Sequence, residues 1–551
     1  MATTLQTSTL GQIRGKSGDG VTQYLGIKYA NLKNRFADAE LIESRGSGTL
    51  DGTRDGPTAL SHPIGCEREL GHVQHSLPEK ELYQSDLDCL NLNIAVPSDT
   101  TPSSKLPVLF FIHGGGLFVG ANSWPQYDLT RLVKLSKDRS LPTVVVAINY
   151  RLGAAGFLTS EELRNAGYKA NNGLRDQRVA LEWVRKNIVD FGGDPDNITV
   201  GGMSAGAASV TYHLQSSKPL FKRAIAMSGT SLLTKALPYE LHEENYKRAV
   251  AALDLTDATA EERVKALLEM PGQKLIAKLP PSVFQAPALD NDIVYPGVTY
   301  TKLAEMDSNT LPGKSWCQDL LVGNAEVDVR LPTLPKPLTN RRVPQASIFE
   351  YMAPKMKNNC ARRFVSAINE ALASYPQIAE RILQAYDITE DSPDENAIMA
   401  VLTYFTDIVF HAPALTYAQG WRGNAYVYYF NEGNPWDGPW KNRANHILDV
   451  TYFFQNFREF LTTEQQAVCT VFAEDFFKFC HGIAPWPAIT PGKIKTGFSA
   501  RIYGPSRSGI TANVSSQAFG GETLRRSVLF DCASVVPLDE LARVFVIFQT
   551  T

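Results

Sequence analysis

The sequence predicts an α/β fold with a central sheet that is mostly parallel. Residues 107–112 and 144–148 are continuous apolar runs, which is typical of parallel strands buried on both faces. Residues 197–201 have a β-branched strand pattern, and residues 207–212 have the composition of the start of a helix. With 551 residues, 44% of them hydrophobic, the chain can bury a large core around such a sheet.

The first candidate functional residue lies between that strand and that helix. Residues 202–206 are Gly-Met-Ser-Ala-Gly, the G-x-S-x-G pattern in which a sharp strand-to-helix turn exposes a serine hydroxyl at the edge of a sheet. Glycines flank the serine because so tight a turn leaves no room for side chains. The pattern alone also fits an ordinary turn, so its place between a strand and a helix is what makes Ser204 a candidate nucleophile.

A second motif follows the predicted strand 107–112, where His113 precedes three glycines. Consecutive glycines leave backbone N–H groups uncovered, so that they can face an oxygen on which negative charge develops. We expect the N–H groups of Gly115, Gly116 and Ala205 to form an oxyanion hole. The alternative is a flexible loop without chemistry, and the serine motif farther along the chain favours the oxyanion hole.

A serine nucleophile needs a histidine base, which in sites built on this motif lies after the serine and the acid in the chain. His446 is favoured because it lies in a polar loop that runs into an aromatic segment. His411, in a helix-like pattern at a pocket wall, is the second choice. We expect His213 to be packed beside the serine motif and His481 to end a helix, where a cation is favourable.

Two carboxylates are candidates for the acid that orients the histidine. Residues 318–323 have the pattern of a strand that ends in a glycine, and Glu326 and Asp328 follow it closely. Either one could reach the distal imidazole nitrogen and hold its tautomer. Each could also be a solvated loop carboxylate, so these residues alone leave both assignments open.

Ordered motifs along most of the chain carry a resemblance to a known family. They are YLGIKYA at 24–30, DCLNLN at 88–93, NYRLG at 149–153, NGLRDQ at 172–177, FGGDP at 191–195 and MSG at 227–229. The chain resembles the type-B carboxylesterases and lipases, the family that also contains the cholinesterases, and its fungal branch most of all. The resemblance implies one domain over residues 5–551 with an α/β-hydrolase fold. It also implies large helical insertions near 235–285 and 345–420 that form a cap and a gorge.

The resemblance also implies an activity, that of a carboxylic ester hydrolase with a Ser–acid–His triad. The family acid lies five residues after the glycine that ends the strand, so counting from Gly323 favours Asp328 over Glu326. The triad then falls on Ser204, Asp328 and His446. No metal or organic cofactor is expected, because the serine ester carries the acyl group.

Departures from the family pattern refine the expected substrate. Met203 stands where the family usually has glutamate before the nucleophile, which argues against choline esters and indicates a more apolar site. The acid is Asp328 where glutamate is usual, and Asp449 replaces a glutamate whose role we expect to be structural. We therefore expect a neutral or hydrophobic ester, such as a fungal secondary metabolite.

Two other functions remain open at this point. The same serine could pass its acyl group to an acceptor other than water, which would make the protein an acyltransferase or a cyclase. A non-catalytic binding protein on the same fold is less favoured, because such relatives typically lose the serine or the histidine, and Ser204 and His446 are both present.

Composition indicates the partners and the compartment. The net charge of −3 and the absence of a basic block give no sign of nucleic acid binding, and no stretch approaches the ~20 apolar residues of a membrane span. We expect a small-molecule ester as the partner of a monomer or homodimer. No signal peptide is visible, which predicts a cytoplasmic protein unless a leader was removed. By the resemblance, Cys66 and Cys89 fall where the family has its first disulfide.

Overall fold

A large mixed sheet forms the centre of the computed structural model, which describes residues 2–44, 48–78, 80–280, 282–328, 359–489, 498–516 and 523–550. The 13 strands of this sheet in the described chain are β1 Ala2–Gln6, β2 Gln12–Gly18, β3 Val21–Lys28, β6 Thr49–Asp51, β7 Asn91–Pro97, β8 Leu106–Ile112, β9 Val144–Ile148, β10 Gly193–Met203, β11 Arg223–Met227, β12 Asp319–Ala325, β13 Asn424–Phe430, β14 Ala500–Tyr503 and β15 Ala512–Ser515. Two short strands, β4 Ala30–Asn31 and β5 Glu40–Leu41, pair separately.

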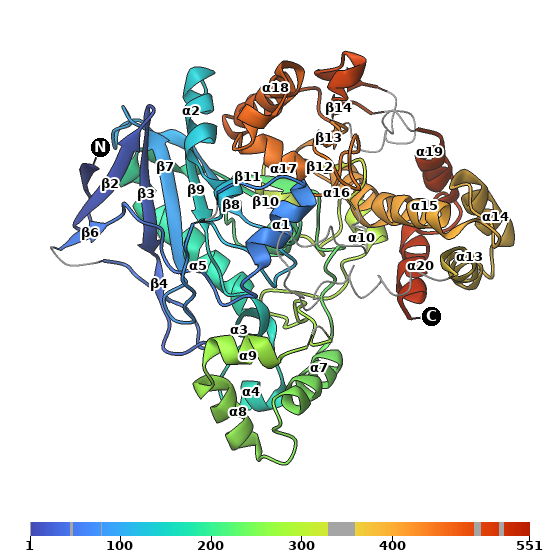
Figure 1. Ribbon diagram of the computed structural model, residues 1–551, viewed down its shortest axis with the longest axis horizontal. Helices are drawn as coiled ribbons and strands as arrows, with labels where there is room; N and C mark the ends of the chain where they lie inside the picture. Colours follow the sequence, from blue (N-terminus) through green and yellow to red (C-terminus); the bar gives the residue numbers. More distant parts are fainter. Residues whose placement is uncertain are drawn as a thin grey trace.

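The strand order confirms the prediction of a mostly parallel centre. It is β1-β2-β3-β7-β9-β8-β10-β11-β12-β13-β14-β15, with β6 beside β2 (Figure 1). All neighbours from β9 through β14 in this order are parallel. The outer strands of this order pair antiparallel, which ends the parallel block at β9 on one side and at β14 on the other, while β6 pairs parallel with β2. The carboxyl ends of β8, β10 and β12 therefore lie along the same edge of the sheet.

Hydrophobic side chains cover both faces of the sheet, because successive residues of a strand point to opposite sides. Val108, Phe110 and Ile112 of β8 belong to one buried cluster, whereas Leu109 and Phe111 belong to the other. Helices of the first cluster include α5 Asn172–Asn187, α6 Ala205–His213 and α16 Ala412–Gln419, and those of the second include α1 Gly65–Val73, α2 Thr130–Asp138, α17 Leu448–Phe453 and α18 Thr463–Cys480.

The remaining helices form two further groups, one with a hydrophobic cluster of its own and one that packs into the first core cluster. A lobe at the bottom of Figure 1 has a small hydrophobic cluster of its own and includes α3 Gly153–Phe157, α4 Glu161–Asn165, α7 Tyr239–Ala252, α8 Ala260–Glu269 and α9 Gly272–Lys278. The other group includes α10 Tyr300–Ala304, α11 Gly313–Trp316, α13 Cys360–Ala371, α14 Pro376–Ala385, α15 Asp394–Thr406, α19 Thr523–Cys532 and α20 Leu538–Thr550. The helical regions expected near 235–285 and 345–420 thus contain α7–α9 and α13–α16, while residues 281 and 345–358 lie outside the described chain.

Short helical turns complete the described elements. They are the 3₁₀ turns η1 Pro125–Tyr127, η2 Ile188–Phe191, η4 Arg458–Phe460 and η6 Ser506–Ser508, and the π-helical turn η3 Asp407–His411, which joins α15 to α16.

The segment 394–419, which runs through α15, η3 and α16, corrects one expectation. By length and composition it could cross a membrane, with a mean hydropathy of 1.5, so the expectation that no stretch approaches a membrane span is wrong here. Its most apolar window is 78% buried inside the molecule. The segment contacts α10, α13 and the strands β12 and β13, and a helix packed on all sides is apolar all round. It is a core segment of this fold.

Candidate active site

Ser204 lies in the turn between β10 and α6, in a backbone conformation that few side chains adopt. Its φ and ψ angles are 54° and −120°, and its N–H donates to the carbonyl oxygen of Met227 over 2.9 Å. No side chain fits at either glycine of the motif. A Cβ on Gly202 would lie 2.5 Å from the backbone of Gly206, and a Cβ on Gly206 would lie 2.1 Å from the oxygen of Ile112. The surrounding backbone contacts therefore hold Ser204 in a strained backbone conformation.

His446 lies beside Ser204, although 242 residues separate them in the chain. The imidazole Nε2 is hydrogen-bonded to Ser204 Oγ over 3.0 Å, and Nδ1 is hydrogen-bonded to Asp328 Oδ1 over 2.9 Å. The backbone N–H of His446 donates to the oxygen of Val327, which fixes the histidine loop against the end of β12. The structure thus brings a nucleophile, a base and a carboxylate into one hydrogen-bonded row.

The two candidate acids have different places in this arrangement. Asp328 is fully buried, its Oδ2 accepts from the N–H of Ala325 over 2.8 Å, and its own N–H donates to Thr406 Oγ1 over 3.1 Å. Glu326 points to the histidine loop instead, where it accepts from the N–H of Ala444 over 3.0 Å and pairs with Arg443 over 2.8 Å. Asp328 therefore orients the imidazole, and Glu326 braces the loop that carries it.

A second buried carboxylate, Asp449, lies next to this row. It accepts hydrogen bonds from Ser228 Oγ over 2.9 Å and from the hydroxyl of Tyr428 over 2.8 Å. Burial raises the pKa of Asp328 to about 7, opposed by hydrogen bonds that include one from Ser228. Burial, and then the nearby charge of Asp328, raise the pKa of Asp449 to about 6. The sequence analysis did not find Ser228 and gave Asp449 a structural role, because only the fold brings these residues to Asp328.

The glycine loop after β8 lies directly against the serine. A Cβ on Gly114 would lie 2.9 Å from the oxygen of Met203 and 3.2 Å from Ser204 Cβ. Gly115 and Gly116 have φ angles of +95° and +65°, and the carbonyl of Gly115 accepts from the N–H groups of Phe118 and Val119 over 3.1 and 3.0 Å. Gly115 and Gly116 thus form a tight turn that directly follows Gly114, the glycine in contact with Ser204.

The third expected donor, Ala205, is the first residue of α6. Its N–H has no acceptor within the helix. A helix N-terminus also carries a partial positive charge, which favours an anion beside Ser204.

His113 supports the glycine loop from behind. Its Nδ1 is hydrogen-bonded to the oxygen of Gly114 over 2.9 Å, and its ring stacks on Tyr150 with centroids 4.6 Å apart. Burial lowers the pKa of His113 to about 4, so the ring is neutral near pH 7. His113 thus holds the glycine loop in position through packing and a hydrogen bond to Gly114.

The other histidines considered from the sequence lie elsewhere. His411, the second choice for the base, lies in η3 with its ring against Tyr429 and Phe530, at centroid distances of 5.1 and 5.8 Å. His213 Nε2 is hydrogen-bonded to Gln177 over 2.8 Å behind α6, and His481 follows the end of α18.

The expected disulfide between Cys66 and Cys89 is not formed among the described residues. Cys66 Sγ donates to Gln126 Oε1 over 3.8 Å, and Cys89 is a buried thiol whose pKa burial raises to about 12. The physical reason is that the two side chains are buried in the hydrophobic clusters on opposite faces of the sheet. In the described chain, no group of three or more His, Cys, Asp or Glu side chains could hold a metal ion.

Comparisons with known proteins agree with this fold and site. A sequence model of the Carboxylesterase family matches residues 1–485. The para-nitrobenzyl esterase of Bacillus subtilis is 30% identical over 82% of this chain and 82% of its own, and a pyrethroid hydrolase of Mus musculus is 28% identical over 89% and 86%. A solved carboxylesterase from Geobacillus stearothermophilus superposes with a TM-score of 0.70 at 26% identity, over 95% of this chain and 99% of its own.

Proposed function

The chain belongs to the carboxylesterase family, and we propose that it hydrolyses carboxylic esters through an acyl-enzyme on Ser204. The observation that carries this proposal is the row of two hydrogen bonds, 3.0 Å from Ser204 Oγ to His446 Nε2 and 2.9 Å from His446 Nδ1 to Asp328 Oδ1. In such a row the base takes the serine proton, and the carboxylate stabilises the imidazolium that forms.

Each step of the proposed reaction is assigned to a side chain or backbone group of this site. His446 Nε2 removes the Ser204 proton as Oγ forms a bond to the ester carbonyl carbon, and the N–H groups of Gly115, Gly116 and Ala205 bind the resulting oxyanion. The carbonyl re-forms as the bond to the alkoxy oxygen breaks, and His446 returns its proton to the leaving alcohol. Water then attacks the acyl-serine with the same base, which releases the acid and restores Ser204.

We propose that the substrate is an uncharged ester with an apolar acyl or alcohol group. Met203, the residue before the nucleophile, is buried and carries no charge that could attract a cation. The ring of Phe410 lies edge-on to His446, with centroids 5.5 Å apart, so an apolar side chain borders the base. The names of the para-nitrobenzyl esterase and the pyrethroid hydrolase support substrates of this kind.

Steady-state hydrolysis of two matched esters tests both parts of the proposal. We expect S-(3,3-dimethylbutyl) thiobutyrate to be cleaved with a kcat/KM at least tenfold above that for butyrylthiocholine, which has the same acyl group, thioester bond and shape and differs by its cation. Ser204→Ala should abolish both activities. Retained activity in Ser204→Ala would contradict the site, and a preference for the thiocholine ester would contradict the substrate class. Identification of the products in the presence of alcohols would show whether water is the main acceptor.

A further inference from the structure

The π-helical turn η3, Asp407–His411, stands out because it touches the candidate site and is rare in form. π-helical turns make up well under 1% of residues and are frequent at functional sites. Thr406, directly before the turn, accepts the backbone N–H of Asp328 on Oγ1 over 3.1 Å, and Phe410 within it contacts the His446 ring. Residues 406–410 therefore contact both the acid and the base.

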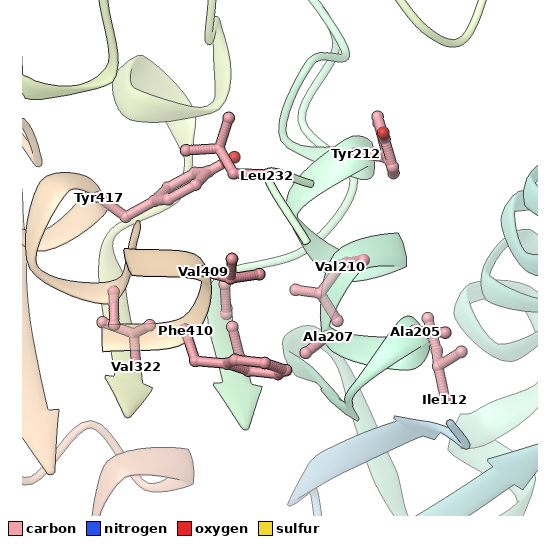
Figure 2. Close-up of a cluster of buried hydrophobic side chains, with 14 of the residues drawn as sticks. Ile112, Ala205, Ala207, Val210, Tyr212, Leu232, Val322, Val409, Phe410 and Tyr417 are labelled. Atoms are coloured by element: carbon pink, nitrogen blue, oxygen red, sulfur yellow. The ribbon is translucent and has the colours of Figure 1, made fainter. Parts of the chain in front are cut away.

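The same turn also reaches the helix that starts at the serine. Figure 2 shows Val409 and Phe410 lying between Val322 of β12 and the residues Ala207 and Val210 of α6, within one buried cluster. A shift of this turn would consequently move groups that contact Asp328 and His446, and it would disturb the packing of α6, the helix that begins directly after Ser204.

The turn is fixed by a buried carboxylate clamp. Asp407 is fully buried, and its two oxygens accept from Arg526 Nε over 2.7 Å, from Arg525 Nε over 2.8 Å and from the hydroxyl of Tyr386 over 3.0 Å. Both arginines come from α19, which lies beyond residue 485, where the match to the family model ends. A buried carboxylate needs such partners, because an unpaired one would be costly to desolvate.

The two arginines differ in how deeply they are buried and in their electrostatic effect on Asp328. Arg526 is the more buried, with 6% of its side chain exposed against 13% for Arg525. The positive charge of Arg526 acts to lower the pKa of Asp328, against the larger effect of burial. Among the residues that the structure describes, the other ionisable groups that face Asp328 are His446 in the histidine loop, Asp449 of α17 and Tyr428 of β13.

From this geometry we infer that Arg526 and Asp407 are positioning residues of the esterase site. Asp407 fixes the turn that holds Asp328 and His446, and Arg526 both clamps Asp407 and balances the charge of Asp328. The inference rests on the proposed function, since it assigns these residues to the Ser204–His446–Asp328 site. It gives helix α19, which lies beyond the residues matched by the family model, a part in the reaction.

The test compares Arg526→Gln with Arg525→Gln, because both remove one arm of the same clamp on the same helix. Without the Arg526 charge, Asp328 ionises less readily and His446 is protonated more readily, so the active form requires a higher pH. We expect Arg526→Gln to move the acidic limb of the kcat/KM profile for p-nitrophenyl butyrate up by about half to one pH unit. The KM should change little, and Arg525→Gln should leave the limb in place. Arg526→Lys, which keeps the charge, should restore it.

A second readout does not depend on activity. The low-field proton resonance of His446 Nδ1–H, assigned by its loss in His446→Ala, should titrate at a higher pH in Arg526→Gln than in Arg525→Gln. An unchanged titration and pH profile in folded Arg526→Gln, or an equal shift in Arg525→Gln, would overturn the inference. A wild-type protein that cleaves no ester would instead overturn the proposed function, and the resonance would still decide whether Arg526 acts on this site.

Discussion

The nucleophile side and the acid–base side of this site are held in place by different means. On the nucleophile side, Ser204 and the loop at 114–116 are fixed by backbone contacts at glycines and by the first turn of α6. On the acid–base side, Asp328 and His446 come from distant segments and are fixed by side chains, among them Thr406 and Glu326. The first side should thus be sensitive to added atoms, and the second to lost charges and hydrogen bonds.

The largest effect is expected at the carboxylate of the acid–base side. Asp328→Asn should lower kcat by about 10³–10⁴ near pH 7, because the amide favours the wrong imidazole tautomer and cannot stabilise the imidazolium. Glu326→Gln is the matched control, since Glu326 touches the histidine loop and not the ring, and we expect a loss of less than about tenfold. Similar losses in both variants, measured by steady-state kinetics, would argue against the assignment of Asp328.

The next effect concerns the backbone of the nucleophile side. A Cβ on Gly115 would lie 2.0 Å from the oxygen of Val119, whereas one on Gly116 meets no atom within 4 Å. We expect Gly115→Ala to lower kcat/KM by about 10²–10³, the cost of a displaced oxyanion donor. Gly116→Ala has only the strain of its φ angle of +65° and should lose less. Equal losses of kcat/KM in the two variants would show that the contact with Val119 does not determine the conformation of the loop.

A smaller loss tests the link between η3 and the acid. Thr406→Val removes the acceptor of the Asp328 N–H and keeps the shape of the side chain, so we expect kcat to fall by roughly tenfold. Thr416→Val serves as control, because the buried Thr416 hydroxyl donates to the carbonyl of Ala412 in its own helix, away from the acid. Equal kinetics in the two variants would remove Thr406 from the account.

The smallest effect is on stability and its pH dependence. The pKa of Asp328 is about 7 in the folded protein and near 4 when unfolded, so the folded state binds more protons between these values. Stability from this group is present below about pH 4 and is lost as the pH rises through about 7. The Tm of Asp328→Asn minus that of the wild type should therefore rise between pH 5 and pH 8, by about 1–3 °C.

Asp51→Asn gives the contrasting case for the same Tm measurement. A hydrogen bond from Thr53, and then one from Arg14, lower the pKa of Asp51 to about 2, so its contribution is already complete at pH 5. Its Tm difference should stay flat over the same range. A flat difference for Asp328→Asn would show that burial of this carboxyl does not oppose folding.

The difference between the two sides also explains which parts of the fold and the site could be predicted from the sequence. The strands at 107–112 and 144–148 and the turn at 202–206 could be predicted because their signals lie within a few adjacent residues. Asp328 and Glu326 are two positions apart after one strand, and residue types alone could not decide which of them faces the imidazole.

The residues that the sequence did not indicate depend on long-range contacts. Asp407 and Arg526 are 119 positions apart and meet only when α19 packs beside η3. The expected Cys66–Cys89 disulfide was wrong because a likeness in sequence position does not show that both thiols lie on one face of the sheet. A buried charge pair leaves no periodic pattern, so Asp407 and Arg526 had to be found in the folded molecule, whereas Asp328 and His446 were already predicted from the sequence pattern and the family spacing.

The most direct test of the account is covalent labelling of the wild-type protein with a fluorophosphonate, followed by mass spectrometry of its peptides. We predict a single adduct on Ser204, with a labelling rate that falls at least 10³-fold in His446→Ala and no adduct in Ser204→Ala. Absence of the adduct from folded wild-type protein, or labelling at another residue, would contradict the claim that Ser204, His446 and Asp328 form an assembled nucleophilic site.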